Sequence, residues 1–392
     1  MKKVAILTLP LHINFGGNLQ AFALFTVLKD LGYDVDLLNI QNEKTKLFGF
    51  FLNVCKQFVK SYLLFKPVSY LFLEKEKELI YKNHSDFISK YLKKSNIIYD
   101  KQSFKSVVAE ERYGAVIVGS DQVWRKDYVK NIETYFLNDV ENLETKKIAY
   151  AASFGVEEWQ FNFAETSRLK NLIHQFKYIS VREDTAVRLC KDNLDIDVEH
   201  VLDPTLLLEK NTYKKLLSNK KSENYGKVFA YILDENEEKI SFVNKVSELL
   251  LKKNFSIKIK ENKDRVFINN INEYCVPDIE DWLKAFDDAS FIITDSFHGV
   301  AFSIIFNKPF IAIVNNKRGS TRFNSMLNLF DLNERAFKDT WSEAEITQAV
   351  FSEIDYHKIN KKISDYRYSI INKLKSLIWM CRLKCWKFTL YH

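Results

Sequence analysis

The segment TDSFHG, residues 294–299, carries the side chain best suited to proton transfer near neutral pH. His298 is one of seven histidines, and it stands at a turn between a strand-like apolar run and a helix-like apolar run. A histidine so placed can act as a general acid or donate to a developing charge. Asp295 is near enough in sequence to orient the ring and is also a candidate acceptor of a proton, and Ser296 and Gly299 of the same turn are candidate binding residues. A histidine satisfied by a backbone carbonyl is the alternative interpretation.

A glycine-rich turn near the N-terminus, NFGGNLQ at residues 14–20, joins a predicted strand to a predicted helix. Backbone N–H groups at the start of a helix bind anions. The turn lacks the Lys and Ser/Thr of a P-loop and is not a GxGxxG motif. We expect substrate contacts from Asn14, Gly16, Gly17 and Asn18.

A second polar turn, GSDQVW at residues 119–124, directly follows the apolar run AVIV. Ligand sites in parallel α/β sheets lie at the carboxyl ends of strands. Ser120 and Gln122 are therefore candidate binding residues, and Asp121 is a candidate acceptor of a proton. Asp121 could instead serve as a helix cap.

Two further strand ends carry cations. The segment SVRED, residues 180–184, presents the planar guanidinium of Arg182, which suits a carboxylate or a phosphate. A salt bridge from Arg182 to Glu183 or Asp184 is the structural alternative. The segment NKRGSTR, residues 316–322, places three cations and a glycine in one turn, as an anion cradle requires. Its cations are Lys317, Arg318 and Arg322.

The elements that position these turns alternate between buried strands and helices, which predicts two α/β halves with parallel sheets. Such halves bind ligands in the cleft between them. We place the domain boundary in the polar segment 211–227. In the first half, strands are expected at 3–9, 34–40, 115–118, 147–152 and 178–182, a helix at 19–31 and a closing strand and exit at 198–208. In the second half, strands are expected at 228–233, 255–260, 291–294 and 309–314, and helices at 237–252, 277–289, 297–306 and 322–329.

The predicted domains are an N-terminal α/β domain, residues 1–210, with a helical insertion at about 46–95, and a C-terminal α/β domain, residues 225–340. A helical segment at 341–392 follows and is expected either to pack back on the N-terminal domain or to rest on a membrane surface. Residues 47–73 and 342–392 are basic and aromatic, as interfacial helices are. No stretch reaches the roughly 18 uncharged apolar residues of a membrane span.

Composition narrows the class of protein. The chain has 392 residues, 46% of them hydrophobic and 28% charged, so it can form a packed core. Its 58 Lys and Arg against 51 Asp and Glu give a net charge of +7, which is too weak for a dedicated nucleic-acid binder and suits small anions or an acidic membrane. Five cysteines predict reduced thiols rather than disulfides or a zinc site. Because no signal peptide is evident, we expect a cytoplasmic protein.

Taken together and in order, six motifs resemble those of the polysaccharide pyruvyl transferase family, over residues 3 to about 330. They are NFGGNLQAFAL, GSDQVW, SVRED, VLDPTLLL, TDSFHGVAFSIIFNKPF and NKRGSTRF. The resemblance implies a fold similar to the two-domain GT-B glycosyltransferases. It also implies transfer of a pyruvyl (carboxyethylidene) group from phosphoenolpyruvate to hydroxyls of a sugar in a capsule, exopolysaccharide or cell-wall polymer. The acceptor is expected on a lipid or nucleotide carrier, and neither a metal nor an organic cofactor is implied.

The resemblance also implies roles for particular residues. The family's donor-binding arginine of the first domain matches Arg182, and its cleft histidine matches His298. The family's arginine two residues before that histidine is replaced here by Ser296. Another cation must then hold the donor, and the candidates are Arg318, Lys317 and Arg322.

Two other functions stay open at this point. A nucleotide-sugar-dependent glycosyltransferase of the same architecture would use the same cations for a sugar diphosphate. A scaffold for membrane-bound polymer assembly would use the basic aromatic helices and would not depend on His298.

Overall fold

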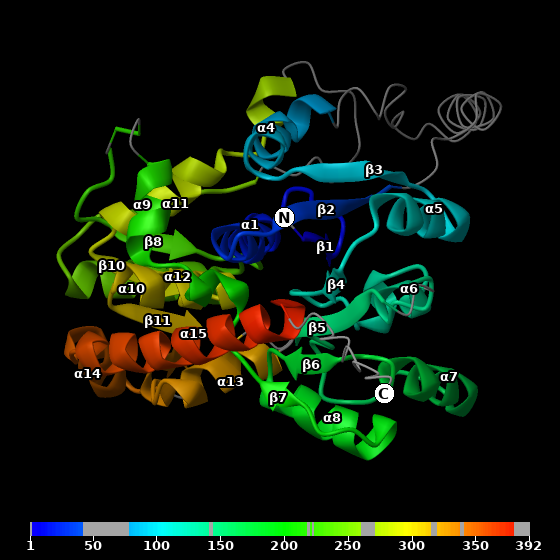
Figure 1. Ribbon diagram of the computed structural model, residues 1–392. Helices are drawn as coiled ribbons and strands as arrows, with labels where there is room; N and C mark the ends of the chain where they lie inside the picture. The colour runs from blue at the N-terminus through cyan, green and yellow to red at the C-terminus, as the bar shows by residue number, and fades with distance from the viewer. Residues whose placement is uncertain are drawn as a thin grey trace, which may run out of the picture.

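The computed structural model describes residues 2–41, 78–140, 144–217, 220–221, 223–259, 271–314, 320–337 and 341–379. Its first half contains a seven-stranded sheet of spatial order β3-β2-β1-β4-β5-β6-β7, with all neighbours parallel (Figure 1). The central strands are buried on both faces, which explains why they are continuous apolar runs in the sequence. The strands are β1 Lys3–Leu7, β2 Asp34–Ile40, β3 Lys94–Ile98, β4 Ala115–Val118, β5 Lys146–Ala152, β6 Tyr178–Val181 and β7 Glu199–His200.

The second half contains a five-stranded parallel sheet of order β12-β11-β10-β8-β9. The two sheets confirm the expected α/β architecture with a sheet in each half of the chain. The strands are β8 Val228–Tyr231, β9 Asn254–Phe255, β10 Phe291–Thr294, β11 Phe310–Ile313 and β12 Ala336–Phe337.

Helices cover both sheets, and several begin at polar caps that the sequence supplies. The side chain of Asn14 accepts a hydrogen bond from the N–H of Gly17 at 3.1 Å, and α14 begins with a capping box of Ser342 and Glu345. The α-helices are α1 Phe15–Asp30, α4 Lys82–Tyr91, α5 Lys101–Glu111, α6 Ile132–Tyr135, α7 Phe163–Ile173, α8 Asp184–Leu194, α9 Lys210–Leu216, α10 Glu237–Leu249, α11 Ile279–Asp288, α12 Phe297–Phe306, α13 Ser320–Leu329, α14 Glu343–Phe351 and α15 Tyr356–Trp379. The 3₁₀ helices are η1 Lys126–Tyr128, η2 Pro204–Leu207, η3 Ile271–Tyr274 and η5 Asn333–Arg335.

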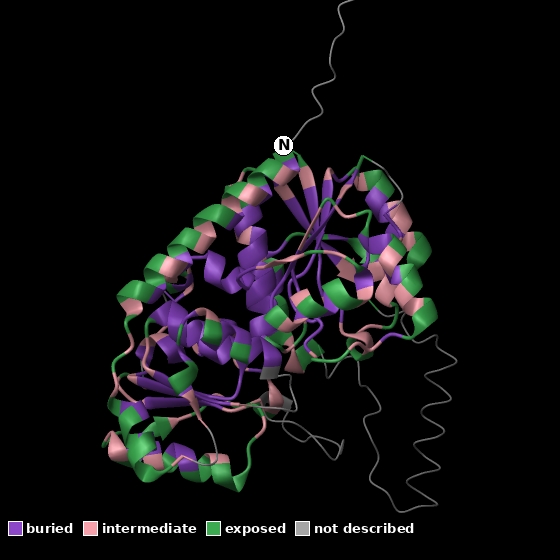
Figure 2. Cartoon of the chain, turned by 90° about the horizontal axis from the view of Figure 1, so that it is seen from below, coloured by how far each residue is buried: buried purple, intermediate pink, exposed green. Residues whose placement is uncertain are grey.

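One apolar core joins the two halves, because residues of α1 in the first half and of α11 and α12 in the second belong to the same buried cluster. Figure 2 shows buried residues in the interior of both halves. At the centre of the shared core the ring of Phe15 stacks on that of Trp282, with centroids 5.4 Å apart. Backbone contacts tie the halves together as well, since the N–H of Val276 donates to the carbonyl of Ile80 at 2.9 Å. The predicted boundary segment contributes α9, whose Tyr213 is also buried in this core.

The helix α15 runs back from the second half to the first (Figure 1). Lys2 and Lys146 of the first half donate from Nζ to carbonyl oxygens in its last turn, at 3.2 Å for Trp379 and 2.8 Å for Leu377. Its apolar face therefore packs on the protein itself, and residues 380–392 lie outside the described part. No helix among the described residues is both long and apolar enough to cross a bilayer. The buried residues of α15 are Ile359, Ile363, Ile370, Leu374 and Ile378.

Two strands, β3 and β12, were not predicted, and two predicted strands are shorter than expected, since 255–260 is reduced to β9 and 198–208 to β7 followed by η2. Of the proposed helical insertion, residues 46–77 lie outside the described part and α4 is helical, but Lys94 begins the edge strand β3. Only Ser95 and Ile98 of β3 are buried, so its sequence lacks a clear apolar pattern. The strand β12 has two residues, which is too short for any periodicity.

Candidate active site

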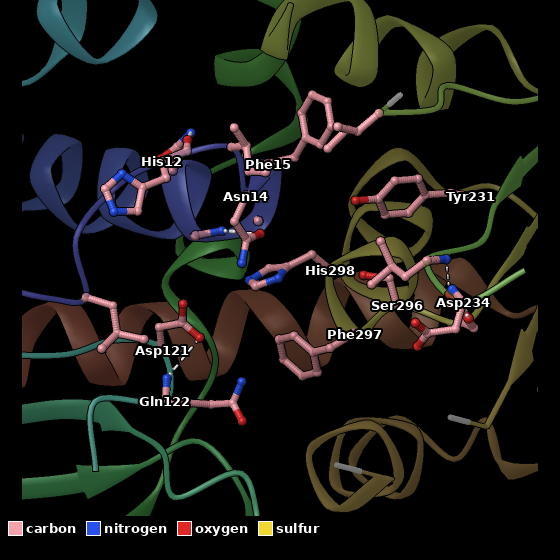
Figure 3. A pocket seen from close by; sticks show the side chains of 18 of the residues that line it. His12, Asn14, Phe15, Asp121, Gln122, Tyr231, Asp234, Ser296, Phe297 and His298 are labelled. Atoms are coloured by element: carbon pink, nitrogen blue, oxygen red, sulfur yellow. Dashed lines mark hydrogen bonds between the residues drawn. The ribbon is translucent and has the colours of Figure 1, made fainter. Parts of the chain in front are cut away.

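A cavity of about 860 Å³ opens between the two sheets, where turns from both halves meet (Figure 3). The turns that follow β1, β4, β8 and β10 all contribute to its wall. These are carboxyl ends of parallel strands, the expected place for a ligand in this architecture. The wall also includes residues 257–259, beyond β9, and the start of α13.

Most of the predicted site residues that the structure describes line this one cavity. Ser120, Arg182 and Gly299 are not in its wall, and Lys317 and Arg318 lie outside the described residues. The predicted residues in the wall are Asn14, Gly16, Gly17, Asn18, Asp121, Gln122, Asp295, Ser296, His298 and Arg322.

His298 lies in the first turn of α12 and reaches across the cavity to the start of α1 (Figure 3). A Cβ atom built on Gly16 would lie 1.9 Å from Nδ1 of His298, so the absence of a side chain at Gly16 lets the ring approach. Burial lowers the pKa of His298 to about 4, although the neighbouring charge of Asp203 acts in the opposite direction. The imidazole is therefore neutral at pH 7 when the cavity holds no ligand.

Asp203, which the sequence prediction did not include, is the carboxylate that lies against the histidine. Its Oδ2 is 3.8 Å from Nε2 of His298, and the side chain is fully buried. The carboxylates with an electrostatic influence on the ring are Asp203 and Asp121. Asp203 belongs to the motif VLDPTLLL, which the sequence analysis singled out. Nothing in that motif indicates that Asp203 lies against His298, almost a hundred positions later in the chain.

The contacts of Asp295 point to a different role from the predicted one. Its carboxylate accepts hydrogen bonds from the N–H groups of Leu233 and Asp234, at 2.6 and 3.2 Å, and pairs with Nζ of Lys239 at 2.7 Å. Asp295 thus holds the turn after β8 in place. The carboxylate facing His298 comes instead from Asp203, so sequence proximity was a poor guide here.

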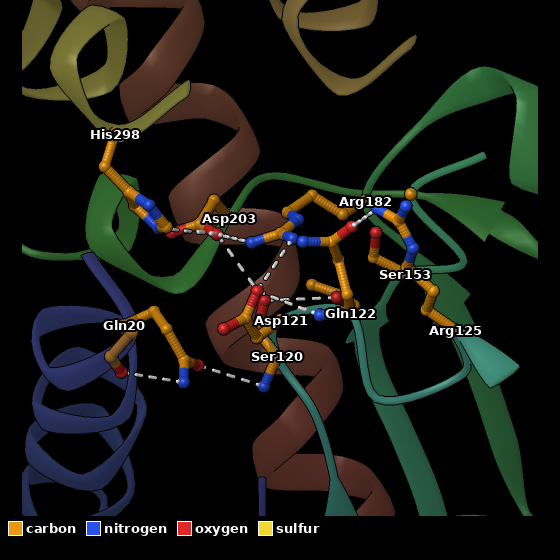
Figure 4. Close-up of polar contacts among 12 residues, drawn as sticks. Gln20, Ser120, Asp121, Gln122, Arg125, Ser153, Arg182, Asp203 and His298 are labelled. Atoms are coloured by element: carbon orange, nitrogen blue, oxygen red, sulfur yellow. Dashed lines mark hydrogen bonds and ion pairs between the residues drawn. The ribbon is translucent and has the colours of Figure 1, made fainter. Parts of the chain in front are cut away.

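Arg182, implied by the resemblance to bind the donor, lies behind the cavity wall. Its side chain is 1% exposed, with Nη1 on Asp203 at 2.9 Å and Nη2 on Asp121 at 3.3 Å (Figure 4). The nearby carboxylates raise the pKa of Arg182 against the effect of burial. A buried guanidinium needs such partners, and here it supports the two carboxylates behind the cavity wall. Glu183 and Asp184, the proposed partners, make other contacts.

Asp121 lies in the wall and is ionised at neutral pH. Burial alone would raise its pKa, but the positive charges of Arg182, of protonated His298 and of Arg322 lower it. The turn around it is fixed from α1, because Oε1 of Gln20 accepts from the N–H of Ser120 at 3.1 Å. Ser120 is thus part of the support of the turn.

Arg322 is a cation of the cavity wall, and it lies on the ring of Phe297 together with Arg182. The guanidinium carbons are 5.6 and 4.8 Å from the ring centroid. Burial, with the repulsion of Arg182, lowers the pKa of Arg322 to about 10, so it stays charged at pH 7. Of the three cations proposed to hold the donor, Arg322 is the one that the structure describes.

A family model for polysaccharide pyruvyl transferases matches residues 14–317, about three quarters of the chain. The chain belongs to the polysaccharide pyruvyl transferase family. No curated protein matches this pyruvyl transferase family member.

Solved structures with a similar fold are nucleotide-sugar enzymes of the GT-B class. The UDP-GlcNAc 2-epimerase from Neisseria meningitidis, bound to UDP-GlcNAc, gives a TM-score of 0.51 at 10% identity and covers 96% of this chain and 100% of the epimerase. The UDP-N-acetylglucosamine 2-epimerase from Rickettsia bellii gives 0.51 at 11% identity, covering 96% and 97%. At these identities the likeness establishes the GT-B-like fold and nothing further.

The second half of this pyruvyl transferase family member adds wall residues that the sequence prediction missed. They lie at the end of β8 and beyond β8 and β9, where the polar run DENEE at residues 234–238 was available as a signal. Among the described residues, no group of three or more His, Cys, Asp and Glu could hold a metal ion. The added wall residues include Tyr231, Asp234, Glu235 and Lys258.

Proposed function

We propose that this protein transfers the pyruvyl group of phosphoenolpyruvate onto two hydroxyls of one sugar, in the synthesis of a cell-surface glycan. The observation that carries the proposal is the meeting of His298, Asp121 and Arg322 in the wall of one cavity. A proton donor, a carboxylate and a cation come there from three separate elements, in a chain of the pyruvyl transferase family.

The chemistry divides between these groups. A proton transferred to the methylene carbon of phosphoenolpyruvate breaks the C=C π bond and leaves an oxocarbenium-like carbon. One sugar hydroxyl adds to that carbon and gives up its proton, and the C–O bond to phosphate then breaks. The second hydroxyl adds to the same carbon, gives up its proton and closes the ketal. One proton is taken up and two are released, of which one returns to the acid and one accompanies the phosphate.

His298 is the proposed acid, and its low pKa makes its protonation depend on the donor. In the empty cavity burial keeps the ring neutral. A bound donor brings a carboxylate and a phosphate, and negative charge nearby favours the protonated ring. Arg322 is the proposed partner of one donor anion, and Asp121 is the proposed acceptor of a hydroxyl proton.

The test is release of inorganic phosphate from phosphoenolpyruvate, measured with a panel of sugar acceptors that carry neighbouring hydroxyl pairs. We expect release that depends on the acceptor and falls by about 10²–10⁴-fold in His298→Ala, the usual contribution of a general acid. A Glu238→Gln variant is the control, because Glu238 is exposed at the start of α10 and is not in the cavity wall. No release with any acceptor, or equal rates in both variants, would contradict the proposal.

The size of the cavity also supports an alternative, a nucleotide-sugar-dependent glycosyltransferase. A volume of about 860 Å³ is near the upper end for pockets that bind drug-sized ligands, and phosphoenolpyruvate alone is far smaller. In our proposal the sugar acceptor and part of its carrier occupy the remaining space. Thermal shift separates the two functions, because stabilisation by UDP-sugars and not by phosphoenolpyruvate would favour the glycosyltransferase.

A further inference from the structure

The carboxylate of Asp203 is held by three partners. Asp203 stands directly before η2, and its Oδ1 accepts from the N–H and Oγ1 of Thr205, at 2.9 and 2.7 Å. Its Oδ2 accepts from Nη1 of Arg182 at 2.9 Å and from Oγ of Ser120 at 3.5 Å, and lies 3.8 Å from Nε2 of His298 (Figure 4). A side chain fixed in this way keeps one oxygen toward the imidazole without relying on the imidazole to hold it.

The imidazole nitrogen of His298 that faces Asp203 makes no hydrogen bond to a described residue. Nε2 is buried and has no hydrogen-bond partner among the described residues, while Nδ1 is the ring atom nearest the Gly16 position. The charged groups that act on the ring are Asp203 before η2, Arg182 at the end of β6, Asp121 after β4 and Arg322 in α13. Asp203 has the largest influence of these four.

A proton on Nε2 would convert the 3.8 Å separation into a charge-assisted hydrogen bond after a small movement of the ring. The same bond would fix the ring orientation, as a buried carboxylate does for the histidine of a hydrolase triad. The second ring N–H, at Nδ1, would then be the one available for transfer.

We propose that Asp203 is a positioning residue, which binds the Nε2–H of His298 and stabilises the protonated ring while an anionic donor is bound. The inference rests on the proposed function, because the donor supplies the additional negative charge. Asp203 itself touches neither donor nor acceptor, since it is not in the cavity wall.

Asp121 provides a matched comparison for the simpler explanation that Asp203 only neutralises Arg182 and caps η2. Both carboxylates pair with the same guanidinium, at 2.9 Å for Asp203 and 3.3 Å for Asp121. Loss of one charge from Arg182 is thus common to Asp203→Asn and Asp121→Asn. The ion-pair geometry with Nε2 of His298 belongs to Asp203.

The direct measurement is ¹⁵N NMR of the full chain labelled at histidine, with the His298 signal assigned from its loss in His298→Asn. We expect phosphoenolpyruvate to bring a proton onto Nε2 in the wild type. In Asp203→Asn the ratio of protonated to neutral ring in the same complex should fall about tenfold or more, because a charge at 3.8 Å is lost. In Asp121→Asn the fall should be smaller.

Kinetics give the second measurement. Asp203→Asn should lower kcat and move the alkaline limb of its pH profile to lower pH, with KM for phosphoenolpyruvate nearly unchanged. Asp203→Glu, which keeps the charge, should recover part of the loss. A fall in kcat with unchanged protonation of His298 would overturn the proposal and leave Asp203 a structural residue.

Two further measurements test the proposal when a variant fails to fold or when phosphoenolpyruvate does not bind. Wild-type His298 with no proton on Nε2 in the phosphoenolpyruvate complex would refute it without any substitution. If phosphoenolpyruvate does not bind, inorganic phosphate serves as the anion in the same spectra. In that case the donor of the proposed function fails, while the Asp203–His298 pair is still tested.

Discussion

The contact between Gly16 and His298 offers a sharp test of the site, because it depends on one missing methyl group. In Gly16→Ala the new Cβ would lie 1.9, 2.2 and 2.6 Å from Nδ1, Cγ and Cε1 of His298. Ordinary contacts between such atoms are about 3.5 Å or more, so the ring must move by about 1.5 Å. The residue lies in the first turn of α1, where alanine is favoured over glycine.

The expected result is a folded protein with impaired chemistry. A displacement of about 1 Å at a reacting group can reduce a rate by about 10²-fold, so kcat should fall by about that factor or more. The cost in stability should stay within the about 1–3 kcal/mol typical of overpacking, offset in part by the helix propensity of alanine.

A glycine outside the cavity wall provides the matched control. In Gly114→Ala the new Cβ would meet the carbonyl oxygen of Lys3 at 3.7 Å, an ordinary contact. Phosphate release from phosphoenolpyruvate and urea unfolding should be measured for both variants. Equal rates in Gly16→Ala and Gly114→Ala would refute the argument that His298 works from its position over α1, and unfolding of Gly16→Ala alone would show that the contact matters for packing instead.

Four further predictions follow from the site and the fold. Arg322→Ala should raise KM for phosphoenolpyruvate by about ten- to a hundredfold, since hydrogen bonds to charged groups contribute about 1.5–3 kcal/mol, and an unchanged KM would send the search to other cations. Asp295→Asn should lower the urea concentration at the midpoint of unfolding, because the N–H groups of Leu233 and Asp234 and the Nζ of Lys239 lose the buried negative charge that they contact. A midpoint like that of the wild type would argue against a positioning role for Asp295. The pKa of His298 is about 4 in the folded chain and 6.5 when exposed, so the unfolded state binds more protons between these pH values. The free energy of unfolding should therefore rise by about 3 kcal/mol from pH 4 to 6.5. Denaturant titrations at several pH values should show this rise in the wild type and its loss in His298→Asn. The apolar face of α15 is buried, so we expect association with acidic vesicles to be weak, to be lessened by salt and to come from the other basic aromatic segments, 47–73 or 380–392. Co-sedimentation that a chain ending at Trp379 retains in full would exclude residues 380–392 as its source.

The sequence predicted the elements whose local signal is strong. The bounds of β2, β4, β10 and α12 agree with the expected ranges, and β4, β10 and α12 are buried, mainly apolar runs bounded by polar or turn-forming residues. The edge strand β3 was missed because it takes its strand conformation from pairing with β2 and carries little apolar pattern of its own.

The location of the site was predictable from the sequence, but the contacts among its side chains were less so. Strand ends with polar residues indicated where the cavity lies, since parallel strands bring those ends to one edge. Which carboxylate faces His298 depended on the packing of η2 between the two halves, a long-range contact that no local spacing encodes. The partners of Arg182 could not be predicted for the same reason, since Asp121 and Asp203 come from two other segments.

The return of α15 onto the first half also constrains how the molecule can be made. Translation produces the N-terminal half first, yet α15, which packs on it, comes from residues 356–379. While the chain is still being synthesised, part of the apolar core around the N-terminal sheet therefore stays exposed, because neither α15 nor the aromatic cluster of α11 and α12 has emerged. A nascent chain stalled before residue 356 should accordingly be a substrate for chaperones that bind apolar segments.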